Sequence, residues 1–321
     1  MVVTRAARTA AIASLVVLAA CGSDTDPAAD SATRSPEPTA TPEAAEFPVT
    51  VEAANGEVVV DAQPTDIVSL SPTATETLFA IGAGDRVAAV DDQSDFPAEA
   101  PVTELSGFEP NVEAIAEYQP DLVLASGDGP SELTDGLNRL GVPVVVQSAA
   151  TDLDDAYQQI EAIGAATGHG DEAAALVADM QDRVAKVIAD LPDGPQLSVF
   201  HELGPDLYTA SSDTFIGQIY AELGLANVAD EAAKQAATPY PQVSVEYLLS
   251  ADPDLVILAD NQCCGVTIEQ AADRPGWDAL TAVQNGAVVV IDEDIASRWG
   301  PRVPDFVEAV ADAIGTARGT G

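Results

Sequence analysis

Basic residues, histidine and cysteine are all scarce in this chain of 321 residues. Twelve Lys and Arg stand against 53 Asp and Glu, which gives a formal net charge of −41 at pH 7. Such a charge opposes binding to nucleic acid or to an anionic membrane surface, so neither is expected as a direct partner. The two histidines, His169 and His201, are too few for a His-rich zinc site, and no metal site is predicted.

The sequence also lacks the motifs of common catalytic sites. Ser71 has no neighbouring His in a nucleophile-elbow pattern. His201-Glu202 lacks the second His of a zinc-hydrolase helix, and there is no phosphate-binding glycine loop. An enzyme is therefore the less favoured class, and no resident cofactor is predicted.

The three cysteines are Cys21 and the adjacent pair Cys263 and Cys264. Their spacing does not match a metal-binding motif. In an exported protein, adjacent thiols can close into a vicinal disulfide. The alternative is a pair of buried thiols that pack as small hydrophobic side chains, and both alternatives stay open at this point.

The first fifty residues predict export and anchoring. Residues 1–21 combine a basic start with an apolar run that is too short to span a membrane, as in a signal peptide. The run ends in Leu18-Ala19-Ala20-Cys21, which resembles a bacterial lipobox, so Cys21 is expected to be lipidated. An ordinary cleaved signal peptide is the alternative. Residues 22–47, rich in Ser, Thr, Pro and Ala, are expected to form a disordered linker. The predicted location is the extracytoplasmic face of the cell membrane, with the lipid as the only membrane attachment.

One helix–strand segment occurs twice in the chain. Residues 111–123 read NVEAIAEYQPDLV, and residues 244–256 read SVEYLLSADPDLV. In each copy a capping residue precedes a short amphipathic helix, a proline ends the helix, and a buried strand follows. Two such copies far apart in the chain predict two similar α/β lobes.

Strands and helices alternate at short spacing around each copy, which is typical of a parallel sheet with helices on both faces. A hairpin precedes the first sheet, and Asn55-Gly56 predicts a type I′ turn in it. From Asp171 to Leu191 neither Gly nor Pro interrupts the helical periodicity, so one long helix should join the lobes rigidly. We therefore expect an α/β fold with two Rossmann-like lobes, 48–168 and 193–321, a connecting helix at 169–192, and a ligand cleft between the lobes. The other predicted elements are strands at 67–70, 86–90, 121–125, 142–146, 197–200, 254–259 and 288–291, and helices at 73–81, 131–140, 215–223 and 305–314.

Several short motifs follow one another along the chain: IVSLSPTATE at 67–76, NVE at 111–113, PDLV at 120–123, VSVE at 243–246, DPDLV at 252–256, PGWDAL at 275–280 and GPR at 300–302. In combination these motifs resemble the class III ABC-transporter substrate-binding proteins, which capture iron–siderophores, haem or cobalamin. The resemblance covers about Val49 to Ile314. It implies two α/β lobes bridged by one long helix, with the ligand in the cleft between them. It also implies delivery of the ligand to an ABC permease dimer with its ATPase, any iron or cobalt coming with the ligand.

The resemblance also assigns roles to single residues. Glu113 and Glu246 match the family's docking acids, one per lobe, which bind arginines of the permease. The alternative is that both only stabilise helix N-termini. Tyr240 matches an aromatic residue of the cleft in cobalamin-type members, and Asp294 with Arg298 matches an Asp/Arg pair there.

The remaining cleft candidates are Ser71, Phe108, Glu202, Trp299 and Arg302. Cobalamin binders carry large rings where this chain has Gln93, Gly107 and Ser126, although Phe108 lies beside one missing ring.

Arg298 and Arg302 suit an anionic ligand such as a ferric siderophore, the alternative being salt bridges to nearby acids. Trp299 is as well explained by packing as by ligand stacking. The predicted function is a membrane-anchored binding protein for an iron–siderophore or cobalamin-type ligand. The alternative is a carrier of haem, with His201 or Tyr240 as axial ligand, or of another metal complex.

Overall fold

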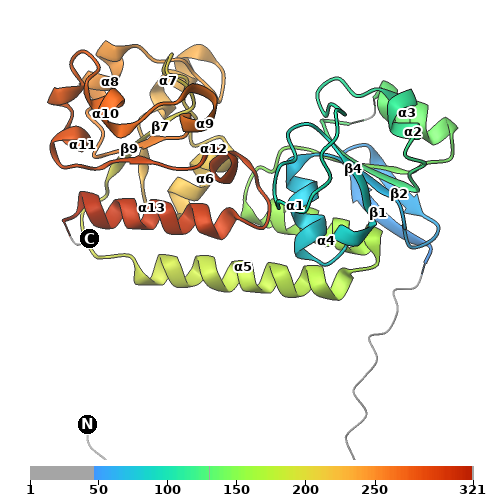
Figure 1. Cartoon of the computed structure of the whole chain (residues 1–321). Helices are drawn as coiled ribbons and strands as arrows, with labels where there is room; N and C mark the ends of the chain where they lie inside the picture. The colour runs from blue at the N-terminus through green and yellow to red at the C-terminus, as the bar shows by residue number, and fades with distance from the viewer. Residues whose placement is uncertain (1–46, 130, 320–321) are drawn as a thin grey trace, which may run out of the picture. The chain divides into compact units, whose positions relative to one another are not determined.

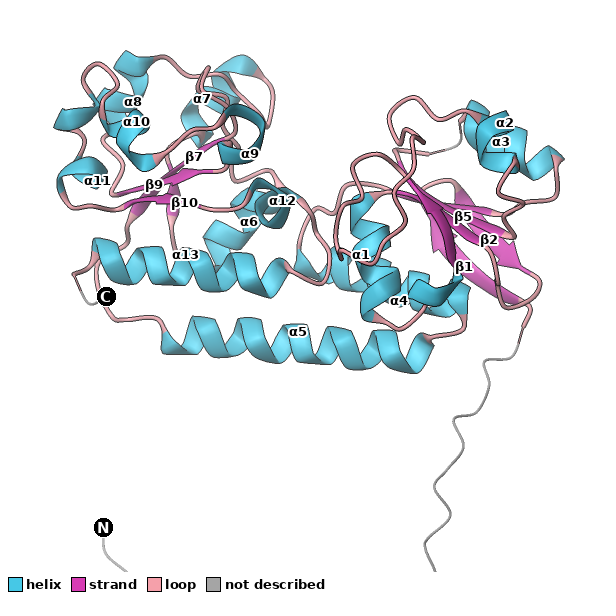
Figure 2. Cartoon of the chain, viewed as in Figure 1, coloured by secondary structure: helices cyan, strands magenta, loops and turns pink. Residues whose placement is uncertain are grey.

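The computed structural model describes residues 47–129 and 131–319 (Figure 1). The expected signal peptide, its Cys21 and nearly all of the expected linker lie outside these residues. The described part contains two parallel sheets of four strands and one antiparallel pair (Figure 2). This arrangement confirms the predicted α/β fold with two parallel-sheet lobes. Among the described helices, none is long and apolar enough to cross a membrane.

The N-terminal lobe is built on the first parallel sheet. Its strand order is β4-β3-β5-β6, and helices enclose it so that alternate residues enter separate hydrophobic clusters. Leu122 and Leu124 thus face one side, and Val123 faces the other. The elements are β3 (Ile67–Leu70), α1 (Pro72–Ala80), a 3-10 turn (Gly84–Arg86), β4 (Val87–Val90), α2 (Val112–Ala116), β5 (Leu122–Ser126), α3 (Glu132–Arg139), β6 (Val144–Gln147) and α4 (Leu153–Thr167).

The hairpin before this lobe forms, but its turn differs from the prediction. Strands β1 (Val49–Ala53) and β2 (Gly56–Val60) pair antiparallel, with Ala53 opposite Gly56. Of the two predicted turn residues only Gly56 has a positive φ, 99°, whereas a type I′ turn needs it at both central positions. The Asn55 side chain instead donates to the Val144 carbonyl and accepts from the Val146 N–H, at 2.9 and 3.1 Å. Contact with β6 therefore decides the turn.

One long helix connects the lobes, as predicted. Helix α5 (Gly170–Asp190) packs against α4 of the N-terminal lobe and against α13 (Val303–Ala317), the closing helix (Figure 2). Its buried stripe recurs at helical spacing, so apolar packing is its main source of stability. The stripe is Ala173, Val177, Met180 and Val184. Arg183 adds ion pairs to Asp305 and Glu308 of α13, which contribute little because all three side chains are partly exposed.

The C-terminal lobe repeats the sheet architecture with strand order β10-β9-β7-β8, all parallel. Residues of β9 again alternate between two clusters, Leu255 and Ile257 in one and Val256 and Leu258 in the other. Its further elements are β7 (Ser198–Glu202), α6 (Phe215–Glu222), β8 (Ala226–Asn227), α7 (Asp230–Ala236), α8 (Val245–Ala251), β9 (Leu255–Leu258), α9 (Asn261–Cys264), α10 (Ile268–Ala272), a 3-10 turn (Trp277–Ala279), α11 (Thr281–Gln284), β10 (Val288–Val290) and α12 (Glu293–Ser297).

Candidate functional site

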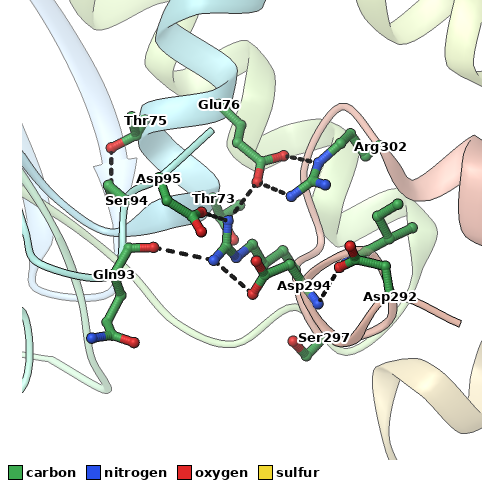
Figure 3. Close-up of polar contacts among 12 residues, drawn as sticks. Thr73, Thr75, Glu76, Gln93, Ser94, Asp95, Asp292, Asp294, Ser297 and Arg302 are labelled. Atoms are coloured by element: carbon green, nitrogen blue, oxygen red, sulfur yellow. Dashed lines mark hydrogen bonds and ion pairs between the residues drawn. The ribbon is translucent and has the colours of Figure 1, made fainter. Parts of the chain in front are cut away.

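Two arginines of the C-terminal lobe meet one buried carboxylate of the N-terminal lobe. Glu76 lies on α1, and its side chain is 1% exposed. Arg302 donates through Nε and Nη2 to the two carboxylate oxygens at 2.8 and 2.6 Å, as Figure 3 shows. Arg298 donates through Nη1 to Glu76 Oε1 at 3.0 Å. This bidentate, charge-assisted geometry is the strong form of an ion pair, and it joins the two lobes.

Further carboxylates surround the two arginines. Arg298 pairs with Asp294, four residues before it on α12, at 2.7 Å and with Asp95 at 3.2 Å, and it donates to the Gln93 carbonyl. Desolvation raises the pKa of Asp294, and Arg298 opposes that rise. Three carboxylates therefore face two guanidinium groups in this inter-lobe cluster, which we define as Glu76, Asp95, Asp294, Arg298 and Arg302. The salt-bridge interpretation of both arginines agrees with this geometry.

Glu76 was not among the cleft residues predicted from the sequence, although Arg298 and Arg302 were. An acid on the buried side of a helix that otherwise carries no charge was the available signal. Burial alone would lower the pKa of Arg302, but the hydrogen bond and charge of Glu76 raise it above its usual value. The Arg302 guanidinium also lies over the Phe96 ring, 4.4 Å from its centre.

Two predicted cleft residues have structural positions instead. Ser71 is 2% exposed and caps α1, its hydroxyl accepting from the Ala74 N–H at 3.4 Å. Trp299 packs on the core, with its ring edge-on to Phe215, and its Nε1 donates to Gln159 Oε1 at 3.1 Å. Both side chains are engaged within the protein, Trp299 is only partly buried, and their place in a ligand cleft stays a prediction.

Glu202 is also buried rather than open to a ligand. It ends β7, it is 0% exposed, and Arg274 donates to both of its oxygens at 2.6 and 2.7 Å. Arg274 lies over Trp277, 4.6 Å from the ring centre, so the same guanidinium group contacts the carboxylate and an indole ring. Glu202 is therefore enclosed in this structure, and its place in a ligand cleft stays a prediction.

His201 is likewise enclosed. It is 0% exposed, its Nδ1 is hydrogen-bonded to the Tyr220 hydroxyl, and desolvation lowers its pKa to about 3. A neutral, fully buried imidazole is not available as an axial ligand at an open site.

Phe108 and Tyr240 are the predicted cleft residues whose rings stay exposed, at 86% and 47%. Desolvation raises the pKa of Tyr240. A side chain does not fit at Gly107, the position directly before Phe108. A Cβ at Gly107 would lie 2.6 Å from Asp91 Oδ2 and 2.8 Å from the Leu70 carbonyl oxygen, so no side chain fits there.

The two candidate docking acids are both exposed and occupy the first turns of α2 and α8. Asn111 caps the first helix and Ser244 caps the second. A hydrogen bond from its own backbone N–H and one from Ser244 lower the pKa of Glu246. Each acid therefore presents a charge to solvent at equivalent places on the two lobes.

The adjacent cysteines lie on α9 and are joined in a disulfide. Both residues are exposed, which contradicts the alternative of two buried thiols. The segment is tied to α12, because the Cys263 N–H donates to the Glu293 carboxylate at 3.1 Å and Gln262 donates to Asp292 at 2.8 Å. Over residues 47–129 and 131–319, no group of three or more His, Cys, Asp or Glu side chains is arranged to hold a metal ion.

Comparison with known proteins identifies the family. The family model described as "Periplasmic binding protein" matches residues 67–295, which is most of the chain. The chain belongs to this family. It is a family of binding proteins rather than enzymes, so this periplasmic binding protein is the substrate-binding component of an ABC importer.

Two curated relatives are similar over most of their length. The ABC transporter substrate-binding lipoprotein YvrC of Bacillus subtilis is 32% identical over 309 residues, covering 93% of each chain. The cobalamin-binding protein of Halobacterium salinarum is 32% identical over 312 residues, covering 94% of this binding protein and 84% of the relative.

Two solved structures share the fold and span nearly their full length. The periplasmic vitamin B12 binding protein BtuF of Vibrio cholerae has a TM-score of 0.64 and 25% identity, covering 79% of this chain and 98% of its own. A protein of an ABC-type Fe3+-hydroxamate transport system from Saccharomonospora viridis has a TM-score of 0.65 and 25% identity, covering 84% and 100%. These likenesses agree with two α/β lobes joined by a long helix.

Proposed function

We propose that this binding protein captures a cobalamin-type ligand and delivers it to an ABC permease dimer with its ATPase. The observation that carries the proposal is the charge of the inter-lobe cluster. Arg298 and Arg302 would favour an anionic ferric siderophore, but both are held by Glu76, Asp95 and Asp294. Three carboxylates against two cations leave negative charge, which repels catecholate and carboxylate complexes. A corrinoid ring with an amide-rich rim does not meet this repulsion.

The exposed aromatic rings support the same ligand class. Phe108 belongs to the N-terminal lobe and Tyr240 to the C-terminal lobe, and both rings are available for stacking on a flat, partly apolar ligand. The similarity to the cobalamin-binding protein of Halobacterium salinarum adds support. Haem is less favoured, because its propionates are anionic and His201 is enclosed.

A neutral or cationic ferric hydroxamate is the second candidate. The same negative charge at the cluster favours it over an anionic siderophore. The similarity to the Saccharomonospora viridis protein points to this class as well.

Titration calorimetry with four probes tests the ligand class: cyanocobalamin, a cationic ferric hydroxamate, a ferric tricatecholate and haemin. We expect cyanocobalamin to bind and the tricatecholate and haemin to fail. Phe108→Ala and Tyr240→Ala should each weaken cyanocobalamin by about 3- to 10-fold, the value of an aromatic contact. Tyr118→Ala, which removes an exposed ring beyond the end of α2, is the matched control. Tight binding of the tricatecholate with none of cyanocobalamin would contradict the proposal.

The proposal includes attachment to the membrane through a lipid on Cys21, which lies outside the described residues. The lipobox-like sequence and the similarity to the lipoprotein YvrC support it. Cys21→Ser should release the protein from the membrane fraction. Incorporation of labelled lipid into that variant would show that Cys21 is not the attachment point.

A further inference from the structure

A second cluster of charged side chains lies inside the C-terminal lobe, where β7 and β9 end. Glu202 ends β7 and Asp260 follows β9, and both residues are 0% exposed. Arg274, in the turn after α10, directs both terminal nitrogens at the Glu202 oxygens. Neither carboxylate oxygen of Asp260 receives a hydrogen bond from a donor in the described part of the chain. Two buried carboxyl groups therefore face one guanidinium group that is already committed.

The neighbouring elements bring no further compensation to Asp260. From β7, the adjacent His201 is neutral because desolvation lowers its pKa to about 3. From α12, Asp292 and Glu293 are acidic and bind the start of α9. The charges that act on Asp260 are those of Glu202 and Arg274. Burying an unpaired, unsolvated carboxylate is costly, and a neutral group is the usual outcome.

We propose that Asp260 and Glu202 form a proton-binding site, in which a protonated Asp260 donates one hydrogen bond to the Glu202 carboxylate held by Arg274. The proton supplies the donor that the pair lacks. It ties the ends of β7 and β9 to the turn after α10. When it leaves, two carboxylates repel each other within the lobe, and the segment from Asp260 to Arg274, which includes the disulfide on α9, loosens.

The direction of the pKa shift agrees with this geometry. Desolvation is the largest cause that raises the pKa of Asp260 from 3.8 to about 7, followed by the charge of Glu202 and the hydrogen bond with it. The folded protein then holds this proton more tightly than the unfolded chain does. The resulting stability is fully present below about pH 4 and is lost as pH rises through about 7.

Infrared spectroscopy and pH-dependent unfolding test the proposal on the full folded protein without any ligand. Wild type should show the C=O band of a buried carboxylic acid at about pH 5 that fades near pH 7. Asp260→Asn should remove this band. It should also flatten the decline in melting temperature that wild type shows between about pH 5 and pH 8. Asp278→Asn, an exposed acid of the same lobe, should change neither measurement.

Glu202→Gln separates proton sharing from simple burial. With Glu202 neutral, Arg274 becomes free to pair with Asp260, which should ionise and lose its acid band although the residue is still present. The protection of residues 260–274 against hydrogen exchange, taken relative to the intrinsic rate at each pH, should fall above about pH 7 in wild type and not in Asp260→Asn. Parallel pH profiles of wild type and Asp260→Asn would overturn the proposal. Persistence of the same acid band in both variants would overturn it too, and the wild-type spectra and exchange rates provide a test even if one variant does not fold.

Discussion

The two copies of the repeated helix–strand segment make similar hydrogen bonds at the beginning of their strands, β5 in one lobe and β9 in the other. At the start of β5, Asp121 accepts from the backbone N–H groups of Thr65 and Asp66 at 2.9 to 3.1 Å. At the start of β9, Asp254 accepts from the N–H and the hydroxyl of Ser198, both at 2.8 Å. In both lobes an aspartate thus fixes the beginning of a neighbouring strand of the sheet, β3 in the first lobe and β7 in the second. The Pro-Asp-Leu-Val sequence is therefore a structural unit that the chain uses twice.

The two lobes differ where the strands end. In the N-terminal lobe Asp91 accepts from the Ser94 hydroxyl. The Thr75 hydroxyl is hydrogen-bonded to the Ser94 hydroxyl and to the Ser69 hydroxyl, each at 2.9 Å. In the C-terminal lobe the corresponding edge contains the Glu202–Arg274 ion pair with Asp260 beside it. Desolvation raises the pKa of Asp91, but the Ser94 hydrogen bond offsets part of the rise. The two lobes thus share one scaffold at the beginnings of the strands and differ at the strand ends, beyond which ligands bind in such sheets.

The largest loss of stability is expected when the Glu202–Arg274 ion pair of the C-terminal lobe is broken. Arg274→Met leaves Glu202 buried without its cation and should lower the free energy of unfolding by about 3–5 kcal/mol. Asp91→Asn, at the hydroxyl-lined edge, keeps a polar partner for Ser94 and should cost about 1 kcal/mol. Denaturant unfolding of both variants measures the difference. Equal losses would mean that the two edges do not differ energetically.

An intermediate effect is expected where the two lobes meet. Glu76→Gln keeps the shape but removes the charge that both arginines contact, and should cost about 1.5–3 kcal/mol. Asp95→Asn removes another acid from the same cluster. Its side chain is 68% exposed, so it should cost less than about 1 kcal/mol. If chemical denaturation gave Asp95→Asn the same loss of unfolding free energy as Glu76→Gln, Glu76 would not be the central acid of the inter-lobe cluster.

The smallest effect on stability, with a large effect on transport, is expected at the N-termini of α2 and α8, where Glu113 and Glu246 lie. Glu113→Arg and Glu246→Arg should each change the free energy of unfolding by less than about 1 kcal/mol. Each should cut uptake of labelled ligand in cells, because like charge would then face the permease arginines that we propose as partners. Glu117→Arg, at the other end of α2, is the control. Normal uptake in the double variant, with ligand binding unchanged, would leave these acids only a helix-stabilising role.

The sequence predicted the elements that depend on local pattern. The uninterrupted periodicity from Asp171 to Leu191 corresponds to α5 (Gly170–Asp190), and the two Asp-Leu-Val runs correspond to β5 and β9. The hairpin strands were found, but the turn was not, because the contacts of Asn55 with β6 join residues about ninety positions apart in sequence.

The candidate site was harder to predict for the same reason. Arg298 and Arg302 reach a Glu76 that lies 222 and 226 positions earlier, and with 53 acids in one chain no local signal selects that partner. Burial was the second obstacle. His201 and Glu202 look like available polar residues in the sequence, but β7 is covered on both faces, so both are enclosed. The first-turn positions of Glu113 and Glu246 needed no long-range information, since a capped helix start can be recognised locally, and their docking role stays a prediction.

The ion pairs at Glu76 join two parts of the chain that are synthesised at different times. Glu76 belongs to the first lobe to be synthesised, whereas Arg298 and Arg302 leave the ribosome among the last residues. A chain that stops before Arg298 has neither guanidinium group for this buried carboxylate, and it has no α13 to pack against α5. The ion pairs that join the first lobe to the last thus form only after nearly the whole chain has been made.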